Sequence, residues 1–314
     1  MRWMMGCALA VLVAACTSRG PAGRITPSTS ALRVPARARV LVFAPHPDDE
    51  TLAVGGLIHR LTKEGVPVRI VFITNGDGYP HAVMDELGTN HPTDSDYVAF
   101  GALRQREAIA AVRKLGLGGG NVRFLGFPDG GLAELWRAHW SRPYVSPYTG
   151  KNHSPYHDTF DPRVDYEGRD LTAVLAKLLG EFRPTVVIMP HPNDTHPDHA
   201  SASWFVTEAV QRVQAEGRVA QDVRLLTYLV HYPSWPLLTG PAEDRRLVPI
   251  PGLAATTWSE ADLTSEELAA KRAALAEYKS QLDVMRGFLK SFAGENELLA
   301  AIDPQLLARI AAQH

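Results

Sequence analysis

The stretch Val40-Leu41-Val42-Phe43-Ala44-Pro45-His46-Pro47-Asp48-Asp49-Glu50 joins an apolar run to a cluster of polar side chains. A short apolar run that ends at a proline is typical of a buried strand. The polar cluster then lies on the loop at the carboxyl end of this strand, and a helix is expected over Leu52–Glu64. Because ligands of open α/β sheets bind outside the carboxyl ends of the strands, this loop is a candidate functional site.

Three side chains of this loop can coordinate a metal or move a proton, namely His46, Asp48 and Asp49. His46 and Asp49 are three residues apart, so a tight turn can aim both at one point, and Asp48 between them is directed elsewhere. Two ligands and a neighbouring carboxylate are what a hydrolytic metal site needs. The structural alternative is a helix N-terminus capped by the two aspartates.

A second stretch repeats this pattern, with an apolar run at Thr185–Met189 and a helix expected over Ala200–Ala215. Between them, His196 and His199 are three residues apart. Two helix caps would rarely produce both clusters by chance, so the pair favours a metal site. We interpret His191 as structural or as a support behind the ligands, because a fourth protein ligand would close the metal site. The connecting run is Pro190-His191-Pro192-Asn193-Asp194-Thr195-His196-Pro197-Asp198-His199.

The rest of the chain alternates between strand-like and helical segments. This alternation predicts parallel βαβ units with right-handed crossovers, and hence an α/β fold: a Rossmann-like, doubly wound, mainly parallel sheet with helices on both faces. In the usual order the first strand neighbours the fourth, which would bring the two polar clusters together. The expected strands are Val40–Phe43, Val68–Thr74, Val122–Phe127, Thr185–Met189 and Arg224–His231. The expected helices are Leu52–Glu64, Tyr97–Leu115, Tyr166–Phe182, Ala200–Ala215, Ser265–Met285 and Pro304–Ala312.

We expect one domain over residues 39–314, preceded by a signal peptide over 1–15 and a flexible tether over 16–38. Long loops are expected near 79–95 and 128–165. The second loop carries aromatic and amide side chains that suit sugar recognition by a lid or groove wall, and the alternative is a surface excursion without a role. These side chains are Tyr144, Tyr148, Asn152, His153, Tyr156 and His157.

The N-terminus has the features of an export signal, because Arg2 precedes an apolar segment, Met4–Ala15, that is short for a bilayer span. Its end, Leu12-Val13-Ala14-Ala15-Cys16, resembles a bacterial lipobox, which implies cleavage before Cys16 and acylation of that residue. We therefore expect a cell-envelope lipoprotein, facing the periplasm or on the outer-membrane surface, with Cys16 as its link to the membrane. The alternative is a secretory signal cut near Ala15, which would give a soluble secreted protein.

Composition narrows the classes of protein. Cys7 and Cys16 are the only cysteines, and Cys7 would leave with the signal, so the mature domain has no disulfide and no thiolate ligand. The net charge of −2 and the lack of a basic patch argue against a nucleic-acid partner. No protein partner is indicated.

These motifs make the chain similar to the PIG-L/LmbE family of zinc-dependent N-acetylglucosaminyl deacetylases, from about Val40 to Met285. The motifs that carry most of this resemblance are Ala44-Pro45-His46-Pro47-Asp48-Asp49-Glu50 and His196-Pro197-Asp198-His199. Weaker ones are Arg104-Gln105-Arg106-Glu107, Lys114-Leu115-Gly116, Phe124-Leu125-Gly126-Phe127-Pro128-Asp129 and Tyr278-Lys279-Ser280-Gln281. The resemblance implies an LmbE-like fold.

The resemblance also implies one Zn²⁺ per chain, with another divalent transition metal as the alternative. His46, Asp49 and His199 would hold it and leave positions for water and the acetyl oxygen. Asp48 would be the general base that takes a proton from the water.

Further residues receive roles from the same resemblance. His196, held by Asp198, would stabilise the tetrahedral oxyanion together with the metal, and it would need to be protonated to do so. Arg104 would bind substrate or a carboxylate in the pocket. Asp129 follows a predicted strand on the same edge of the sheet, so it is a candidate substrate-binding residue that could accept hydrogen bonds from sugar hydroxyls. From the residues alone, Arg104 is equally well explained as a solvated helix-face arginine and Asp129 as a turn residue before Gly130-Gly131.

The expected function is removal of the N-acetyl group from an N-acetylglucosamine-type sugar, in an envelope or extracellular glycan or glycoconjugate. One alternative is a metal-dependent amidase that acts on a non-sugar N-acyl substrate. Another is a glycan-binding envelope lipoprotein with little turnover, although a binding protein needs no base such as Asp48. A two-metal phosphoesterase would require more bridging carboxylates.

Overall fold

The computed structural model describes residues 29–301, apart from 234, 237–245, 251–252 and 254–256. One eight-stranded sheet runs through these residues, in the order β1-β7-β8-β6-β5-β2-β3-β4. Its pairs are parallel except at β8, which is antiparallel to both β6 and β7. The strands are β1 (Thr29–Ala31), β2 (Val40–Ala44), β3 (Val68–Thr74), β4 (Val122–Phe127), β5 (Val186–Pro190), β6 (Arg224–Tyr228), β7 (Thr257–Asp262) and β8 (Asn296–Ala301).

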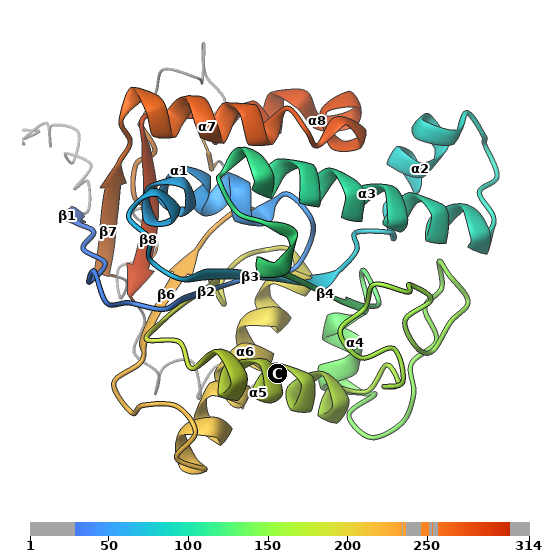
Figure 1. Cartoon of the computed structure of the whole chain (residues 1–314). Helices are drawn as coiled ribbons and strands as arrows, with labels where there is room; N and C mark the ends of the chain where they lie inside the picture. Colours follow the sequence, from blue (N-terminus) through green and yellow to red (C-terminus); the bar gives the residue numbers. More distant parts are fainter. Residues whose placement is uncertain (1–28, 234, 237–245, 251–252, 254–256, 302–314) are drawn as a thin grey trace, which may run out of the picture.

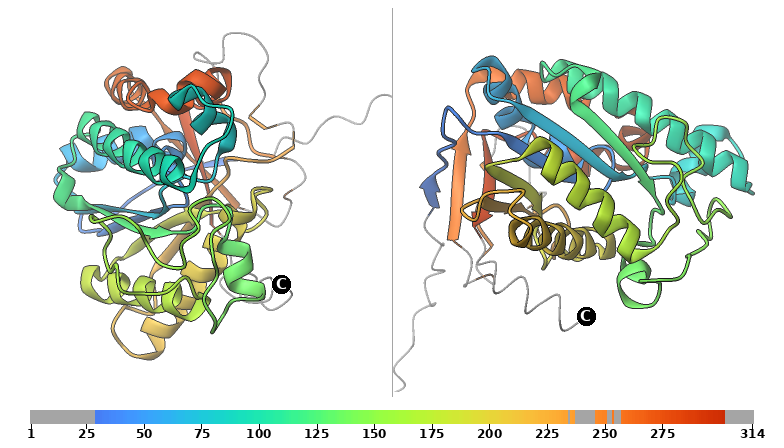
Figure 2. Two further views of the ribbon diagram at one scale, coloured as in Figure 1. Left: turned by 90° about the vertical axis from the view of Figure 1, so that its right-hand side faces the viewer. Right: turned by 60° about the horizontal axis from the view of Figure 1, so that its bottom comes forward.

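Helices cover both faces of the sheet, so the predicted doubly wound α/β fold is confirmed. Helices α1, α3, α7 and α8 lie on one face, and α4, α5 and α6 lie on the other (Figures 1 and 2). The helices are α1 (Asp49–Lys63), α2 (Pro80–Leu87), α3 (Asp94–Lys114), α4 (Leu132–Arg137), α5 (Gly168–Phe182), α6 (Pro197–Ala215), α7 (Ser265–Leu275) and α8 (Lys279–Ser291), with a short 3₁₀ turn at Gly119–Asn121. Among the described residues, none of the helices combines the length and apolar character needed to cross a bilayer.

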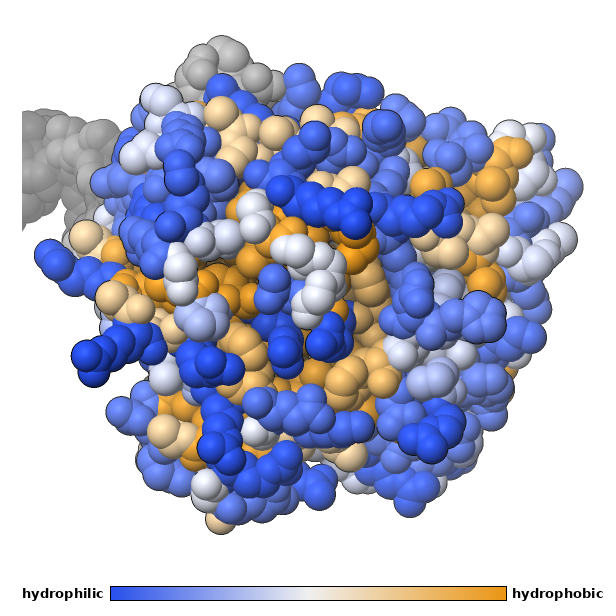
Figure 3. Space-filling model, viewed as in Figure 1, coloured by the Kyte–Doolittle hydropathy of each residue, from blue (hydrophilic) through white to orange (hydrophobic). Residues whose placement is uncertain are grey.

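Strand β2 is buried along its whole length, because helices cover both of its faces. Val40 and Val42 belong to the core under α1 and α3, whereas Leu41 and Phe43 belong to the core under α5 and α6. This two-sided burial explains why the strand reads as a continuous apolar run. On the face shown in Figure 3, hydrophilic residues cover most of the surface, and hydrophobic residues show mainly in recesses between them.

The strand order brings the two polar clusters together, as the sequence predicts. β2 pairs in parallel with β5, with Val40 opposite Val186 and Val42 opposite Ile188. β2 and β5 are therefore neighbours in the middle of the sheet. The loops that follow them meet at its carboxyl edge, which is where open α/β sheets bind ligands.

The predicted single helix Ser265–Met285 is wrong, because the chain breaks between α7 and α8. At the break, the Tyr278 hydroxyl donates to Glu50 at 2.5 Å, and the Ser280 backbone N–H and hydroxyl donate to Glu107 at 2.9 and 2.7 Å. These buried carboxylates lie far away in sequence, so a local pattern could not reveal that they anchor the start of α8.

Other boundaries also need correction. The predicted tether over 16–38 is wrong at its end, because Thr29–Ala31 forms β1 beside β7. The expected long loops near 79–95 and 128–165 contain the helices α2 and α4. The sequence analysis missed β7 and β8. It did not predict β7 because the sequence of this strand, Thr-Trp-Ser-Glu-Ala-Asp, is largely polar. The signal peptide and the helix expected over Pro304–Ala312 lie outside the described residues.

Candidate active site

A cavity of about 390 Å³ lies at the carboxyl edge of the sheet. The loops after β2 and β5 supply much of its polar lining, and the rest of the wall comes from the loops after β3, β4 and β6, from Tyr148, and from α1, α3 and α8. The lining side chains that can bind a metal or move a proton include His46, Asp48, Asp49, Asp129, His196 and His231.

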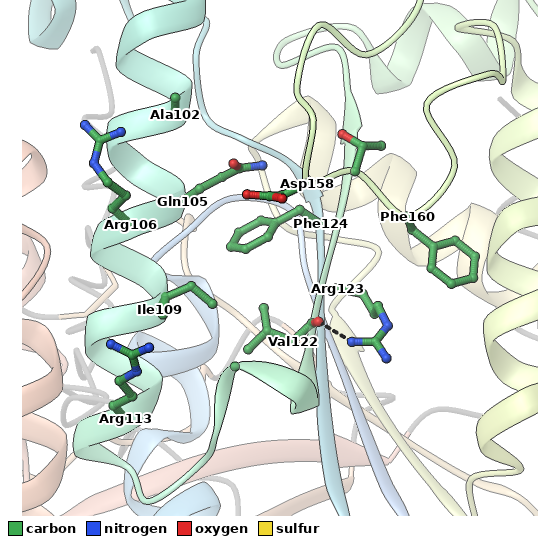
Figure 4. A pocket seen from close by; sticks show the side chains of 12 residues that line it. Ala102, Gln105, Arg106, Ile109, Arg113, Val122, Arg123, Phe124, Asp158 and Phe160 are labelled. Carbon is green, nitrogen blue, oxygen red and sulfur yellow. Dashed lines mark hydrogen bonds between the residues drawn. The ribbon is translucent and has the colours of Figure 1, made fainter.

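A larger hollow of about 850 Å³ lies between α3 and β4 (Figure 4). Its lining includes Arg106, Arg113 and Arg123, but neither of the two groups of metal-binding side chains found in the described part of the chain. The smaller cavity is therefore the candidate active site.

Three predicted ligands converge at the wall of this cavity, which His46 and Asp49 line and next to which His199 is fully buried. The Oδ2 atom of Asp49 lies 3.2 Å from His46 Nδ1 and 3.2 Å from His199 Nε2, and these two nitrogens are 3.3 Å apart. A tetrahedron with edges of about 3.3 Å has its centre about 2.0 Å from each corner, which matches zinc–nitrogen and zinc–oxygen bonds of about 2.0–2.2 Å. The three atoms thus fit one Zn²⁺, and they leave one tetrahedral corner free.

Each histidine of this triad has a carboxylate at its other ring nitrogen. His46 Nε2 lies 3.0 Å from Asp129 Oδ1, and His199 Nδ1 lies 3.3 Å from Asp194 Oδ2. Carboxylates in this position fix the orientation of a metal-binding imidazole and raise its basicity. The second oxygen of Asp129 accepts a hydrogen bond from the Gly78 N–H at 2.6 Å.

At the triad, burial and the neighbouring charges shift the pKa values in opposite directions. Burial favours the neutral form of Asp49, yet His199 and His46 hold the pKa of its carboxyl well below its usual range. Burial also favours neutral histidines, but Asp49 and Asp194 raise the pKa of His199 to about 10, and Asp129 contributes most to raising that of His46. The carboxylates that stabilise positive charge on these rings would stabilise a divalent cation in the same place.

Asp48 sits beside the triad in a strained backbone conformation. Its φ of 128° is rare outside glycine, and such conformations cost about 1–3 kcal/mol and cluster at active sites. Asp48 Oδ2 accepts a hydrogen bond from Arg104 Nη2 at 3.0 Å, and its backbone N–H donates to Glu50 at 3.2 Å. Burial raises the pKa of Asp48 to about 8, although Arg104 works in the opposite direction. The carboxylate is therefore a stronger base than an exposed aspartate.

Arg104 is buried, with 3% of its surface exposed, so its interpretation as a solvated helix-face arginine is wrong. Besides Asp48, its guanidinium donates to the carbonyls of Gly76 at 2.9 Å and Pro47 at 2.5 Å. Arg104 thus ties the loops after β2 and β3 together beside the cavity.

His196 caps the N-terminus of α6, and its Nδ1 accepts a hydrogen bond from the backbone N–H of Asp198 at 3.3 Å. Burial lowers the pKa of His196 to about 4, and the neighbouring His46 and His199 lower it further. Both effects favour the neutral ring and act against the protonated His196 expected from the sequence. In the neutral ring, the accepting Nδ1 places the proton on Nε2, which can still donate a hydrogen bond.

The carboxylate of Asp198 has partners other than the one expected. It accepts hydrogen bonds from the N–H groups of Gly130 at 2.7 Å and Leu132 at 3.0 Å, and it lies 3.4 Å from His46 Nε2. Asp198 meets His196 only through its backbone in these contacts. The predicted contact between Asp198 and His196 is present, but it is made by the Asp198 backbone N–H, because the turn after β4 occupies the carboxylate.

Sequence reasoning missed two residues of the site, Asp194 and His231. Asp194 accepts hydrogen bonds from the N–H groups of Val230 and His231 at 3.0 Å each, which fixes it behind His199. The ring centroid of His231 lies 4.9 Å from that of His199. Both residues follow the carboxyl ends of neighbouring strands. This position in the predicted sheet could have identified them as site candidates from the sequence.

The fold and the site together define an α/β protein with a metal centre of the hydrolytic type. The chain belongs to the PIG-L family, because the family profile, described as GlcNAc-PI de-N-acetylase, matches residues 41–210.

Several relatives share the name 1D-myo-inositol 2-acetamido-2-deoxy-alpha-D-glucopyranoside deacetylase. The protein from Mycobacterium sp. (strain KMS) is 32% identical over 183 residues, which cover 56% of this chain and 51% of the relative. The chain thus spans about half the length of this relative. The protein from Mycolicibacterium vanbaalenii is 30% identical over 277 residues, which cover 85% of this chain and 88% of the relative.

Solved structures share the fold. A conserved protein from Thermus thermophilus has a TM-score of 0.51 at 24% identity, and the match covers 85% of this chain and 95% of that one. The zinc-inhibited form of a teicoplanin deacetylase has a TM-score of 0.52 at 17% identity, with 83% and 97% covered. At these identities the likeness shows the fold alone.

Proposed function

We propose that this protein hydrolyses the N-acetyl group of an N-acetylglucosamine-type sugar. The observation that carries the proposal is the triangle of His46, Asp49 and His199, with Asp48 beside it in a strained conformation at the same cavity. The named activity of the relatives, removal of acetyl from an acetamido-glucoside, supports this class of substrate.

His46, Asp49 and His199 would hold a zinc ion, which would serve as a Lewis acid toward water and the amide carbonyl. Asp48 takes the proton of the attacking water, and its raised pKa suits a general base near neutral pH. Arg104 holds the carboxylate of Asp48 in place at 3.0 Å. The Nε2–H group of His196 donates to the carbonyl oxygen as that oxygen gains negative charge. The proton on Asp48 is then available for the leaving amine.

Asp129 acts through His46 in this proposal, rather than on the substrate. One of its oxygens faces His46 Nε2 and the other accepts from Gly78 N–H, so both are already engaged. Asp194 holds His199 in the same way, from the other side of the triad. The two carboxylates keep the two ring nitrogens aimed at the metal.

We also propose that the protein works in the cell envelope, on an envelope or extracellular glycan, and is anchored by lipid at Cys16. This proposal rests on the lipobox-like end of the N-terminal segment, Leu12-Val13-Ala14-Ala15-Cys16. Metabolic labelling with a fatty acid should mark the wild-type chain and leave Cys16→Ser unmarked. Equal labelling of both chains would refute the anchor without affecting the proposed chemistry.

The activity itself can be tested by product analysis. Purified protein with one equivalent of zinc should release acetate and a free amine from acetamido-sugars, and it should do so much faster than from N-acetylated amines without a sugar. Preference for the non-sugar amides would identify an amidase of another class. Sugar binding without acetate release would identify a glycan-binding protein.

A further inference from the structure

The segment between α4 and α5 is an insertion that is pinned to the rest of the domain at several points. The Tyr156 hydroxyl donates to the carboxylate of Asp77, which is buried on the loop after β3. The backbone N–H of Phe160 donates to the Phe124 carbonyl at 2.8 Å, which attaches the insertion to the edge strand β4 beside the hollow in Figure 4. The Tyr166 hydroxyl donates to the Gly126 carbonyl at 2.8 Å. These contacts make the insertion a fixed wall rather than a lid.

Two glycines accommodate tyrosines of this wall. A Cβ atom at Gly101 would lie 2.1 Å from the Tyr156 hydroxyl, and one at Gly78 would lie 2.6 Å from Tyr148 Cε2. Distances under 3.0 Å are not tolerated by real Cβ atoms, so both tyrosines pack directly on backbone. The wall is therefore seated close to the loop after β3, whose Gly78 N–H also holds Asp129.

Tyr148 is the tyrosine of this wall that faces the candidate active site. It lines the same cavity as Asp48 and His196, and its side chain is only partly buried. Its ring lies 5.4 Å from that of Tyr97 on α3, at an interplanar angle of 46°. Tyr97 packs beside the ring, and Tyr148 presents aromatic surface to the cavity.

We propose that Tyr148 is a carbohydrate-binding residue, and that its ring receives the apolar C–H face of the acetamido-sugar while the acetamido group lies at the triad. This inference rests on the proposed function for the orientation of the sugar, but not for the binding itself. Sugar rings expose C–H groups on one face, and an aromatic side chain offers them a large rigid apolar surface. The polar groups of Asp48 and His196 act on the acetamido group in the proposed function, so Tyr148 contributes to binding and not to the chemical step.

The experiment compares Tyr148→Ala, Tyr148→Phe and Val145→Ala as full-length, zinc-loaded proteins. Val145 belongs to the same insertion and is 58% exposed, so its substitution is the control for changes in the loop. Calorimetry should show about tenfold weaker binding of N-acetylglucosamine to Tyr148→Ala, and values within about twofold of wild type for the other variants. In turnover, KM should rise by about the same factor in Tyr148→Ala, with kcat within about twofold.

The outcomes separate this inference from the proposed function. Weaker sugar binding by Tyr148→Ala supports the inference even if the wild type releases no acetate, and in that case the proposed function alone fails. Equal binding of the sugar by wild type and Tyr148→Ala overturns the inference, as does a wild type that binds no sugar. A fall in kcat with unchanged KM would also overturn it, because it would place Tyr148 in the chemical step.

Discussion

Two parts of the candidate active site are built in different ways. In the metal-binding part, His46 and Asp49 come from one turn, and His199 comes from the turn after the neighbouring strand. In the other part, Tyr148 belongs to a segment that is held by Asp77 and Phe124, which are distant in sequence. The first part follows from short local motifs on adjacent strands, whereas the second depends on long-range contacts. Substitutions in the metal-binding part should therefore lower kcat, whereas substitutions near Tyr148 should raise KM.

The largest loss of activity is expected from substitutions in the metal-binding part. His199→Ala removes one corner of the ligand triangle and leaves the carboxylates of Asp49 and Asp194 without the ring that lies between them, so the metal should be lost and activity should fall to background. Elemental analysis of the purified protein measures the metal directly, with Val145→Ala as the control. Full metal content in His199→Ala would remove this residue from the ligand set.

The second largest loss of rate is expected from Asp48, which we propose as the general base and not as a metal ligand. Asp48→Asn keeps the shape of the side chain and its contact with Arg104 but removes the basic oxygen. The rate should fall about 10²–10⁴-fold, with metal content and KM close to wild type. A rate within a few-fold of wild type would show that another group takes the proton.

A smaller effect is expected one contact away from the metal. Asp194→Ala removes the carboxylate behind His199 and should weaken zinc affinity about 10–100-fold. Competition with a chelator of known affinity measures this change. If the affinity is unchanged, the orientation of His199 does not depend on Asp194.

The smallest effect is expected at the insertion. Tyr156→Phe removes the hydroxyl that binds Asp77 and loosens the wall behind Tyr148, so KM should rise a few-fold while kcat and metal content stay the same. Hydrogen exchange should become faster in residues 143–160. A fall in kcat without a change in KM would mean that this segment affects the chemical step and not sugar binding.

The sequence predicted much of the metal-binding part because the motifs that build it are short and local. Residues three apart on the loops after Val40–Phe43 and Thr185–Met189 converge as expected, since these two strands are neighbours in the sheet. The predicted parallel order was sufficient to place them together. Their roles as ligands remain predictions until the metal is measured.

The sequence failed where partners lie far apart in the chain. The carboxylate of Asp198 accepts hydrogen bonds from N–H groups of the turn after β4, 66 and 68 residues away, and nothing in the sequence indicated these partners. The break between α7 and α8 depends on Tyr278 reaching Glu50 across 228 residues. A helical pattern gives no sign of such a contact, because side-chain spacing describes only the neighbouring turns.

The most direct test of the central claim is whether acetate release from an acetamido-sugar depends on zinc. The full-length protein is stripped with a chelator, incubated with an acetamido-sugar, and then given one equivalent of zinc. The account predicts no hydrolysis before zinc is added, and afterwards one acetate for each free amine formed, with Asp48→Asn much slower under the same conditions. Hydrolysis by the stripped protein, or no acetate after zinc is restored, would contradict it.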